Sequence, residues 1–431
     1  MNQPPTSLLS PLRQHRRILA AALVGTTVEF YDFYVFATAT ALVFGPLFFP
    51  AASPAAQGIY SFMAFGIAFV ARPIGAVLFG HFGDRVGRKS TLVASLLLMG
   101  GCTFAIALLP AYASAGWLAP ALLCTLRFGQ GFGLGGEWGG AALLAVEYAP
   151  EGWHARFGAA PQLGAPIGFL AANGLFLILG VCLTPAEFLA WGWRVPFLLS
   201  AVLVGLGLWV RLRIAETPAF ADAIARKTRV RVPLAYLLRR HFGVLMAGSA
   251  GVVACFALFY LATAFALSLG TGALGYNRTD FLLVQLGANL FFAVGIVLAA
   301  IWADKTRPGE VLGWGSVLTV LVGLAFGPGL LSGSLVWVFV TLSAALLVMG
   351  LVYGPLGGWL PTLFPVPLRY TGISLAFNLG GILGGALSPL AAEVLARGGW
   401  GAAVGLILAV AGLLALAGVS LARPAPVPAA A

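Results

Sequence analysis

The chain has few charged residues. Of its 431 residues only 9% are Asp, Glu, Lys or Arg, whereas 60% are hydrophobic. A soluble globular protein carries about 25% charged residues. A sequence this poor in charge excludes an ordinary soluble fold and predicts a protein that crosses a membrane many times.

Cysteine and histidine are also scarce, with four residues of each. The cysteines lie in or beside apolar runs without metal-ligand spacing, which argues against a disulfide framework and a metal site. The histidines form no cluster with Cys, Asp or Glu at a spacing that a catalytic or metal centre needs. We therefore expect no metal and no cofactor, and the sequence does not favour an enzyme.

Long apolar runs, in contrast, are abundant. A helix needs ~20 apolar residues to cross the hydrocarbon core of a bilayer. Twelve runs meet this need, with approximate limits 18–44, 57–79, 90–110, 118–146, 157–182, 192–211, 242–269, 278–302, 311–331, 334–354, 370–396 and 399–421. They predict an all-α membrane protein of twelve transmembrane helices in two pseudo-symmetric six-helix halves.

The longest polar interruption lies between the sixth and seventh runs, and it holds eight cations from Arg211 to Arg240. It divides the chain into an N-terminal bundle (1–211), a basic cytoplasmic linker (212–240) and a C-terminal bundle (241–431). If both termini are cytoplasmic, 19 of the 24 Lys and Arg residues lie on the cytoplasmic side, as the positive-inside rule requires. These cations account for the net charge of +11, so we expect membrane lipid as a partner and no nucleic acid.

A charged turn separates the second and third runs. Residues 80–89 read Gly-His-Phe-Gly-Asp-Arg-Val-Gly-Arg-Lys, and their glycines and cations predict a tight reversal at the cytoplasmic surface. Asp84, Arg85 and Arg88 are therefore candidate gating residues. Asp304 lies in a weak echo of this turn between the eighth and ninth runs and is a further candidate.

Two carboxylates lie inside the first run, where an ionisable group is costly and usually faces a cavity. Glu29 and Asp32 are three residues apart and so share one face of a helix. Two close carboxylates in a low-dielectric cavity resist ionising together, so one is expected to hold a proton near neutral pH. They are candidate proton-coupling residues. The alternative is a structural pair bridged to arginines.

Further charges lie in the second and fourth runs. Arg72 is either a substrate ligand, because a guanidinium can donate two hydrogen bonds to a carboxylate, or a brace near the cytoplasmic end. Arg127 is a candidate partner of a substrate or of a carboxylate, and Glu137 is a proton site or a brace. Glu147 is a candidate gating or loop contact. Tyr31 and Tyr34 are further candidate substrate ligands. So are Gln162, Tyr260 and Asn378, for each of which the alternative is a hydrogen bond between helices.

Seven motifs are spread through the whole chain. They are Glu29-Phe-Tyr-Asp-Phe33, Arg72-Pro-Ile-Gly75, the turn at 80–89, Gly135-Gly-Glu-Trp-Gly-Gly140, Trp191-Gly-Trp-Arg-Val-Pro-Phe197, Glu216-Thr-Pro218 and Arg369-Tyr-Thr-Gly372. Together they resemble the major facilitator superfamily, and within it the metabolite:proton symporter family of carriers for 2-oxoglutarate, citrate, shikimate and osmolytes. The resemblance implies a twelve-helix fold and proton-driven uptake. It also places Arg194, with Glu29, Asp32, Arg72 and Glu137, at the family's charged positions, and Arg194 joins the gating candidates.

The function we expect is proton-coupled import of a small organic acid, a carboxylate, by alternating access. The expected location is the bacterial cytoplasmic (inner) membrane, with both termini inside and the protein working as a monomer. An osmolyte or zwitterion symporter is an alternative. A drug/proton antiporter is a second alternative. The intramembrane arginines disfavour it, because efflux carriers often have more hydrophobic cavities.

Overall fold

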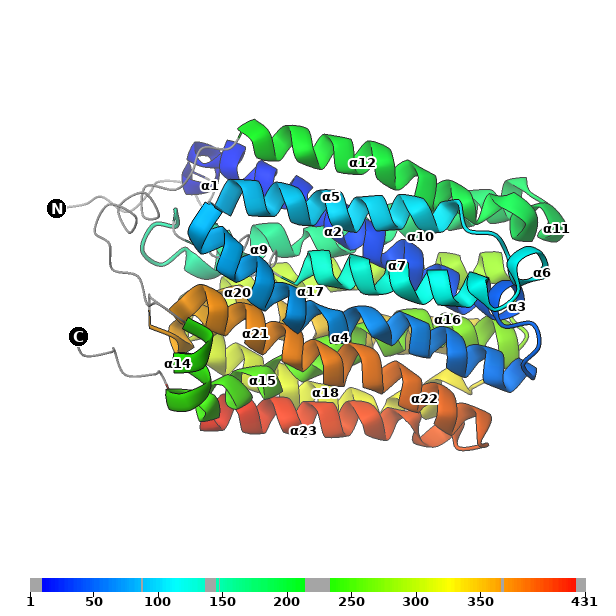
Figure 1. Cartoon of the computed structure of the whole chain (residues 1–431). Coiled ribbons are helices and arrows are strands. Elements are labelled where there is room, and N and C mark those ends of the chain that lie inside the picture. The colour runs from blue at the N-terminus through cyan, green and yellow to red at the C-terminus, as the bar shows by residue number, and fades with distance from the viewer. Residues whose placement is uncertain are drawn as a thin grey trace.

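A bundle of long helices makes up the fold. The structure is a computed structural model that describes residues 10–86, 88–135, 145–146, 148–213, 233–365 and 368–423. Every regular element in these ranges is a helix, since in lipid a helix satisfies all of its own backbone hydrogen bonds. The long helices run side by side along one axis (Figure 1). The prediction of an all-α membrane protein is confirmed.

The first half of the chain contains twelve described helical elements. They are α1 (Ser10–Gln14), α2 (Arg16–Leu42), α3 (Phe44–Phe48), α4 (Pro54–Val86), α5 (Arg88–Ala107), α6 (Tyr112–Ala115), α7 (Leu118–Leu134), α9 (His154–Gln162), α10 (Gly164–Cys182), α11 (Pro185–Glu187), the π-helical turn η1 (Phe188–Gly192) and α12 (Arg194–Arg213). The short elements α3, α6 and α11 lie at one end of the bundle, which we call the α11 end, on the right in Figure 1.

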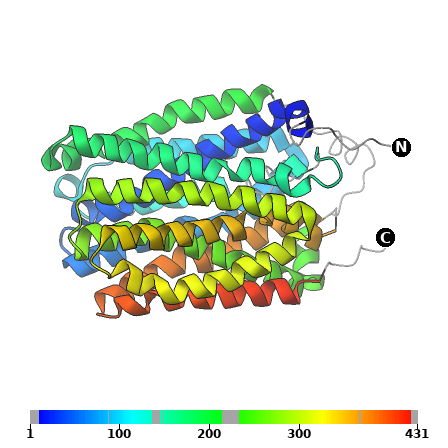
Figure 2. The same cartoon turned by 180° about the vertical axis from the view of Figure 1, so that it is seen from behind.

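The second half is interrupted by wider helical turns. Its elements are α14 (Pro233–Arg240), α15 (Phe242–Tyr260), η2 (Leu261–Phe265), α16 (Ala266–Ser268), η3 (Leu269–Ala273), α17 (Arg278–Lys305), α18 (Pro308–Leu330), α19 (Leu335–Tyr353), α20 (Leu356–Leu363), α21 (Arg369–Gly381), η5 (Ile382–Leu387), α22 (Ser388–Arg397), η6 (Gly401–Val404) and α23 (Gly405–Leu421). Elements η2, η3 and η5 are π-helical, a geometry that recurs at functional sites. α2 begins and α23 ends at the same end of the bundle, the α1 end, on the left in Figure 1 and on the right in Figure 2.

The helix lengths agree with the predicted membrane spans. In the described ranges, nine helices are long and apolar enough to cross a bilayer, and a tenth span results if the bent pair Pro185–Gly192 and Arg194–Trp209 counts as one. α5 adds a shorter apolar stretch, Val93–Ala107, and α7 has 17 residues. The predicted turn at 80–89 is shorter than expected, because α4 stays helical to Val86 and α5 begins at Arg88.

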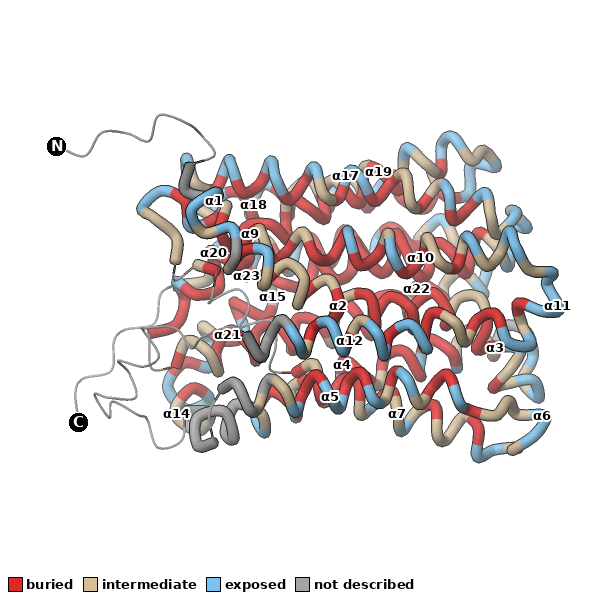
Figure 3. Tube along the Cα trace, turned by 90° about the horizontal axis from the view of Figure 1, so that it is seen from above, coloured by how far each residue is buried: buried red, intermediate tan, exposed pale blue. Residues whose placement is uncertain are grey.

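Burial follows the expectation for a bundle in lipid. Large apolar side chains such as Val70, Leu97 and Leu298 are exposed on the outside, and buried residues gather toward the middle of the bundle (Figure 3). The stretch Phe242–Ala273 has its most apolar window wholly buried inside the protein. It is therefore a central helix that meets other helices rather than lipid.

The two halves of the chain meet along a seam that positions the site. On the first-half side it is formed by α2, α4, α9 and α10, and on the second-half side by η2, α17, α21 and η5. The contacts run α10 to α17, α9 to α17, α2 to η2, and α4 to α21 and η5. Any group that must respond to a relative movement of the halves has to lie at or near this seam.

Glycines bring α4, one of the helices of the seam, into close contact with α7. A Cβ at Gly131 would stand 2.5 Å from Ala68 Cα, and a Cβ at Gly75 would stand 2.8 Å from the carbonyl carbon of Phe132. Small residues allow such backbone approach in membranes, where no hydrophobic force drives helices together. The approach holds α4 and α7, which carry the two intramembrane arginines, at a fixed distance.

Gly131→Ala should destabilise the protein by about 1–3 kcal/mol or more, because the added methyl forces α4 and α7 apart. Gly174→Ala in α10 is the matched control, since no atom of the described structure lies within 4 Å of its Cβ position and alanine favours a helix over glycine by about 1 kcal/mol. Thermal unfolding of the purified protein in detergent measures both. A Gly131→Ala variant as stable as the parent would contradict the close packing.

Candidate functional site

Asp32 is buried in the middle of α2 with a relative exposure of 1%. Its Oδ1 accepts a hydrogen bond of 2.5 Å from Ser200 Oγ of α12, and its Oδ2 accepts one of 3.3 Å from Thr103 Oγ1 of α5. Hydroxyl donors of this kind stabilise an ionised carboxylate, and they can turn to accept a bond when the carboxyl carries a proton. Asp32 is thus held by side chains that fit either protonation state.

A chain of hydrogen bonds leads from Asp32 to Arg127. Gln130 Nε2 donates to Thr103 Oγ1 at 2.7 Å, and Arg127 Nη1 donates to Gln130 Oε1 at 3.1 Å. Arg127 Nε also donates to the carbonyl oxygen of Phe65 at 3.4 Å. Gln130 binds Thr103 through its amide nitrogen and Arg127 through its amide oxygen, so the hydrogen bonds are continuous from Asp32 to the guanidinium of Arg127.

Two buried guanidinium groups lie against one aromatic ring. The Cζ atoms of Arg72 and Arg127 stand 4.4 and 4.3 Å from the centre of the Phe33 ring, within the range of a cation–π interaction. Both arginines are buried. Among the described residues, Arg72 Nε and Arg127 Nη2 have no hydrogen-bond partner. A buried donor without a partner is costly, so the pair is suited to receive an anion.

Aromatic side chains pack around Arg72. Its guanidinium lies over the rings of Phe33 and Phe69, with its Cζ atom 4.4 and 4.5 Å from their centres, and the ring of Tyr260 packs against both. Glu29 is buried on α2 one turn from Asp32.

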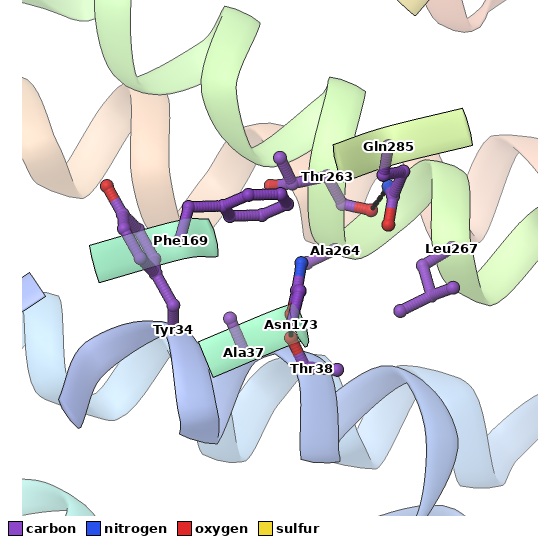
Figure 4. Close-up of a pocket in the computed structure, with 9 residues that line it drawn as sticks. All are labelled: Tyr34, Ala37, Thr38, Phe169, Asn173, Thr263, Ala264, Leu267 and Gln285. Carbon is purple, nitrogen blue, oxygen red and sulfur yellow. Dashed lines mark hydrogen bonds between the residues drawn. The ribbon is translucent and has the colours of Figure 1, made fainter. Parts of the chain in front are cut away.

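A small cavity opens in the seam next to this group (Figure 4). It offers about 10 Å³ to water-sized molecules, roughly the room that one water needs. Its lining comes from both halves of the chain: Tyr34, Ala37, Thr38, Phe169, Asn173, Thr263, Ala264, Leu267 and Gln285. Tyr34 stacks on Phe259, which packs against Tyr260. The Tyr260 ring in turn lies against Phe33, the ring that both arginines share, so packed aromatic rings join the cavity to the arginine pair.

Buried amide side chains join the halves across the seam. Gln162 Nε2 donates to the carbonyl of Tyr353 at 2.8 Å, and Asn378 Nδ2 donates to the carbonyl of Gly135 at 2.7 Å. Tyr31 instead stays within the first half, where its hydroxyl donates to the carbonyl of Pro196 at 2.9 Å. For Gln162 and Asn378, the hydrogen bond between helices that was the alternative to substrate contact is therefore present.

At the α1 end, Asp304 of the second half binds residues of the first half. Its Oδ2 accepts from Arg156 Nε at 2.5 Å, and its Oδ1 accepts from the backbone N–H of Ala155 at 2.7 Å. The carboxylate of α17 thereby sits at the N-terminus of α9, where the helix dipole favours a negative charge. The Arg156 guanidinium also lies 3.7 Å from the Trp153 ring. This arrangement is a latch between the halves.

At the α11 end, α22 packs on α4 beside Glu393, which was not among the residues predicted from sequence. Its Oε1 accepts from Arg397 Nε at 2.8 Å, and its Oε2 lies 3.5 Å from Ser268 Oγ. The pair packs on Gly58 of α4, where a Cβ would stand 2.8 Å from Arg397 Nη2. Glu393 and Arg397 both belong to α22, so here the halves meet by packing on Gly58 and not through this ion pair.

The remaining gating candidates, and the proton-site candidate Glu137, divide into two groups. Arg194 donates from Nη1 to the carbonyls of Ala107 and Leu109 at 2.6 and 2.7 Å, so it braces α12 on the end of α5. Glu137 and Glu147, and the side chains of Asp84, Arg85 and Arg88, lie outside the described residues.

Sequence reasoning missed Thr103, Gln130 and Ser200, which hold Asp32 and Arg127 together. Gln130 could have been found, because it lies three residues after Arg127 in an apolar run and so shares its helix face. Thr103 and Ser200 give no such signal, since a hydroxyl in a membrane helix usually bonds to a carbonyl of its own helix.

Comparisons with known proteins find similarity to transporters. Residues 18–231 match the family described as "Sugar (and other) transporter". The chain is 47% identical to the inner membrane metabolite transport protein YhjE of Escherichia coli K12, over 96% of this chain and 94% of that protein. It is 36% identical to the shikimate transporter of the same organism, over 91% and 90% of the two chains.

A more distant relative and a solved structure add to this comparison. A proline/betaine transporter of Escherichia coli K12 is 28% identical, over 88% of this chain and 77% of that one. The crystal structure of a D-xylose-proton symporter matches 93% of this chain and 97% of its own with a TM-score of 0.70. At 18% identity, that likeness shows the fold alone.

Proposed function

The chain belongs to the major facilitator superfamily, within its metabolite:proton symporter family, and we propose that it imports a small organic acid together with a proton. Its relatives are multi-pass membrane transporters of metabolites and not enzymes, as the sequence predicted. The observation that carries the proposal is the pair of buried guanidinium groups, Arg72 and Arg127, each with a nitrogen that lacks a partner in the described structure. A carboxylate supplies the anion and the acceptor atoms that the pair requires.

Coupling to protons follows from the chain of hydrogen bonds that ends on Arg127. When Asp32 is ionised, its negative charge helps to balance Arg127 through Thr103 and Gln130. A proton on Asp32 removes that charge from a region of low dielectric constant, and a substrate carboxylate then replaces it. Proton and substrate therefore favour each other's binding, and this mutual effect is what symport requires.

Alternating access would open the two ends of the seam in turn. We assign the α1 end, with the Asp304–Arg156 latch, to the cytoplasm, and the α11 end, where α22 packs on Gly58, to the outside of the inner membrane. The bundles 1–211 and 241–431, joined by the linker 212–240, would rock about the arginine pair and the cavity in a single monomer. The proline/betaine relative supports an osmolyte symporter as the second candidate.

Uptake into liposomes tests the proposal. With the purified protein in vesicles that are alkaline inside and acidic outside, labelled carboxylates should accumulate, and a protonophore should abolish the accumulation. Labelled betaine and proline serve as the comparison. Carboxylate uptake that ignores the pH gradient would exclude symport, and accumulation of betaine alone would assign the protein to the osmolyte carriers.

A further inference from the structure

Helix α17 of the second half lies along α9 and α10 of the first half, which together form the span His154–Cys182. Asp304, the last residue but one of α17, binds the start of α9, and Arg278, the first residue of α17, contacts the last turn of α10. The two spans are therefore antiparallel, and each end of α17 touches the other half of the chain.

At the α11 end, the guanidinium of Arg278 lies on the last turn of α10. Its Nη2 donates to the carbonyl of Gly180 at 3.5 Å, and a Cβ at Gly180 would stand 3.1 Å from this nitrogen and 3.3 Å from Nε. Its Cζ lies 3.9 Å from the centre of the Phe188 ring in η1, within the range of a cation–π interaction. Glycine at position 180 thus leaves the room that the guanidinium occupies.

Opposite charges on α17 meet opposite ends of the neighbouring span. The last turn of a helix carries carbonyls without partners and a partial negative charge, and the first turn carries free N–H groups and a partial positive charge. Arg278 supplies a cation at the end of α10, and Asp304 supplies an anion at the start of α9. Between them, Asn289 Nδ2 donates to the carbonyl of Pro166 at 2.9 Å. α17 thus holds the first half at three levels.

Opening the seam at one end has to break the contact at that end. α17 has 28 residues, so its two ends are about 42 Å apart. A relative tilt of the halves can therefore separate one end while the other stays in contact. The two contacts resist opposite movements: the Asp304–Arg156 latch resists opening at the α1 end, and the contact of Arg278 resists opening at the α11 end.

We propose that Arg278 is the gating residue of the α11 end, and that its contacts with Gly180 and Phe188 hold the outer side of the carrier closed. This inference rests on the alternating access of the proposed function, and not on its substrate or its proton. The ion pair of Glu393 and Arg397 lies within α22, whereas Arg278 joins the two halves. Without Arg278, the outer end opens more often and the cytoplasmic end opens less often, because the two open forms compete for the same molecules.

The labelling rate of a buried cysteine measures opening at each end. Ala264→Cys, in a protein whose four native cysteines are replaced by alanine, places a thiol at the cavity, where Ala264 is 2% exposed. A membrane-impermeant thiol reagent reaches it from the outside in intact cells and from the cytoplasmic side in inside-out vesicles, with no substrate present. Arg278→Met should speed labelling from the outside about threefold or more and slow labelling from the cytoplasmic side. Asp304→Asn should do the reverse.

Gly180→Val tests the same contact with Arg278 still present. Its side chain would take the place of the guanidinium, so it should change both labelling rates as Arg278→Met does. Gly174→Val in the same helix is the matched control and should label as the parent does, because no atom of the described structure lies within 4 Å of its Cβ position. Rates that Arg278→Met leaves unchanged, or raises alike from both sides, would overturn the inference alone. Labelling from one side only, in the parent and in every variant, would overturn alternating access as well.

Discussion

Replacing Asp32 by Asn should abolish accumulation driven by a pH gradient while exchange of substrate across the membrane continues. The amide cannot bind and release the coupling proton, yet it occupies the volume of the carboxyl group. Coupling between two sites is typically worth about 5–150-fold, so accumulation should fall by at least about fivefold, to the level that exchange alone supports. The measurement is uptake into liposomes with an imposed pH gradient, beside counterflow of labelled substrate without one.

Ser200→Ala is the matched control for Asp32→Asn. It removes the 2.5 Å hydrogen bond to Asp32 Oδ1 but keeps the carboxyl group, so accumulation should weaken without being lost. If Asp32→Asn accumulates substrate as the parent does, Asp32 is a structural residue and the coupling proton binds elsewhere. Glu29, which shares the helix face of α2, would then be the first residue to replace.

Arg127→Met should weaken substrate binding by at least ~30-fold. Removing one partner of a buried, hydrogen-bonded charge pair costs about 2–5 kcal/mol, and Arg127 bears one of the two unpartnered guanidinium nitrogens of the described site. Arg127→Lys should fall between this variant and the parent, because an ammonium keeps the charge but loses the planar fork of donors. Binding of labelled substrate to the purified protein gives the affinities directly.

Arg194→Met is the control that separates binding from folding. Arg194 is a membrane arginine of the same half, but it donates to the carbonyls of Ala107 and Leu109 at the α11 end. Its loss should lower the thermal stability and leave the affinity of the folded protein close to that of the parent. An Arg127→Met protein that binds carboxylates normally would remove the arginine pair from the substrate site.

The pattern of the sequence was sufficient for the class of fold. Apolar runs of ~20 residues have few alternatives to a membrane helix, and the structure contains the helices that these runs predict. The intramembrane charges were visible for the same reason, because Asp32, Arg72 and Arg127 stand out against apolar neighbours. That all three are buried follows from the cost of exposing such groups to lipid.

The contacts that buried polar residues make with other helices could not be predicted in the same way. Thr103 and Ser200 bind Asp32 from positions 71 and 168 residues away along the chain, and no local period marks them. Glu393 lies near a predicted loop, and only the fold brings it against Gly58 of the first half. The hydrogen bonds of Gln285 and Asn289 likewise join separate elements, because the carbonyls that their nitrogens meet belong to η2 and α10.

The sequence by itself thus determined that this protein is a polytopic helical membrane protein with a few ionisable groups buried in its first half. The cost of placing charge and backbone in lipid is a local property of each segment, so the sequence is enough to reveal it. Only the tertiary structure decided that Asp32 connects to Arg127, that two guanidinium groups share Phe33, and that Asp304 pairs with Arg156 across the seam. These features depend on short-range contacts between helices distant in the chain, and their geometry exists only after the helices have packed.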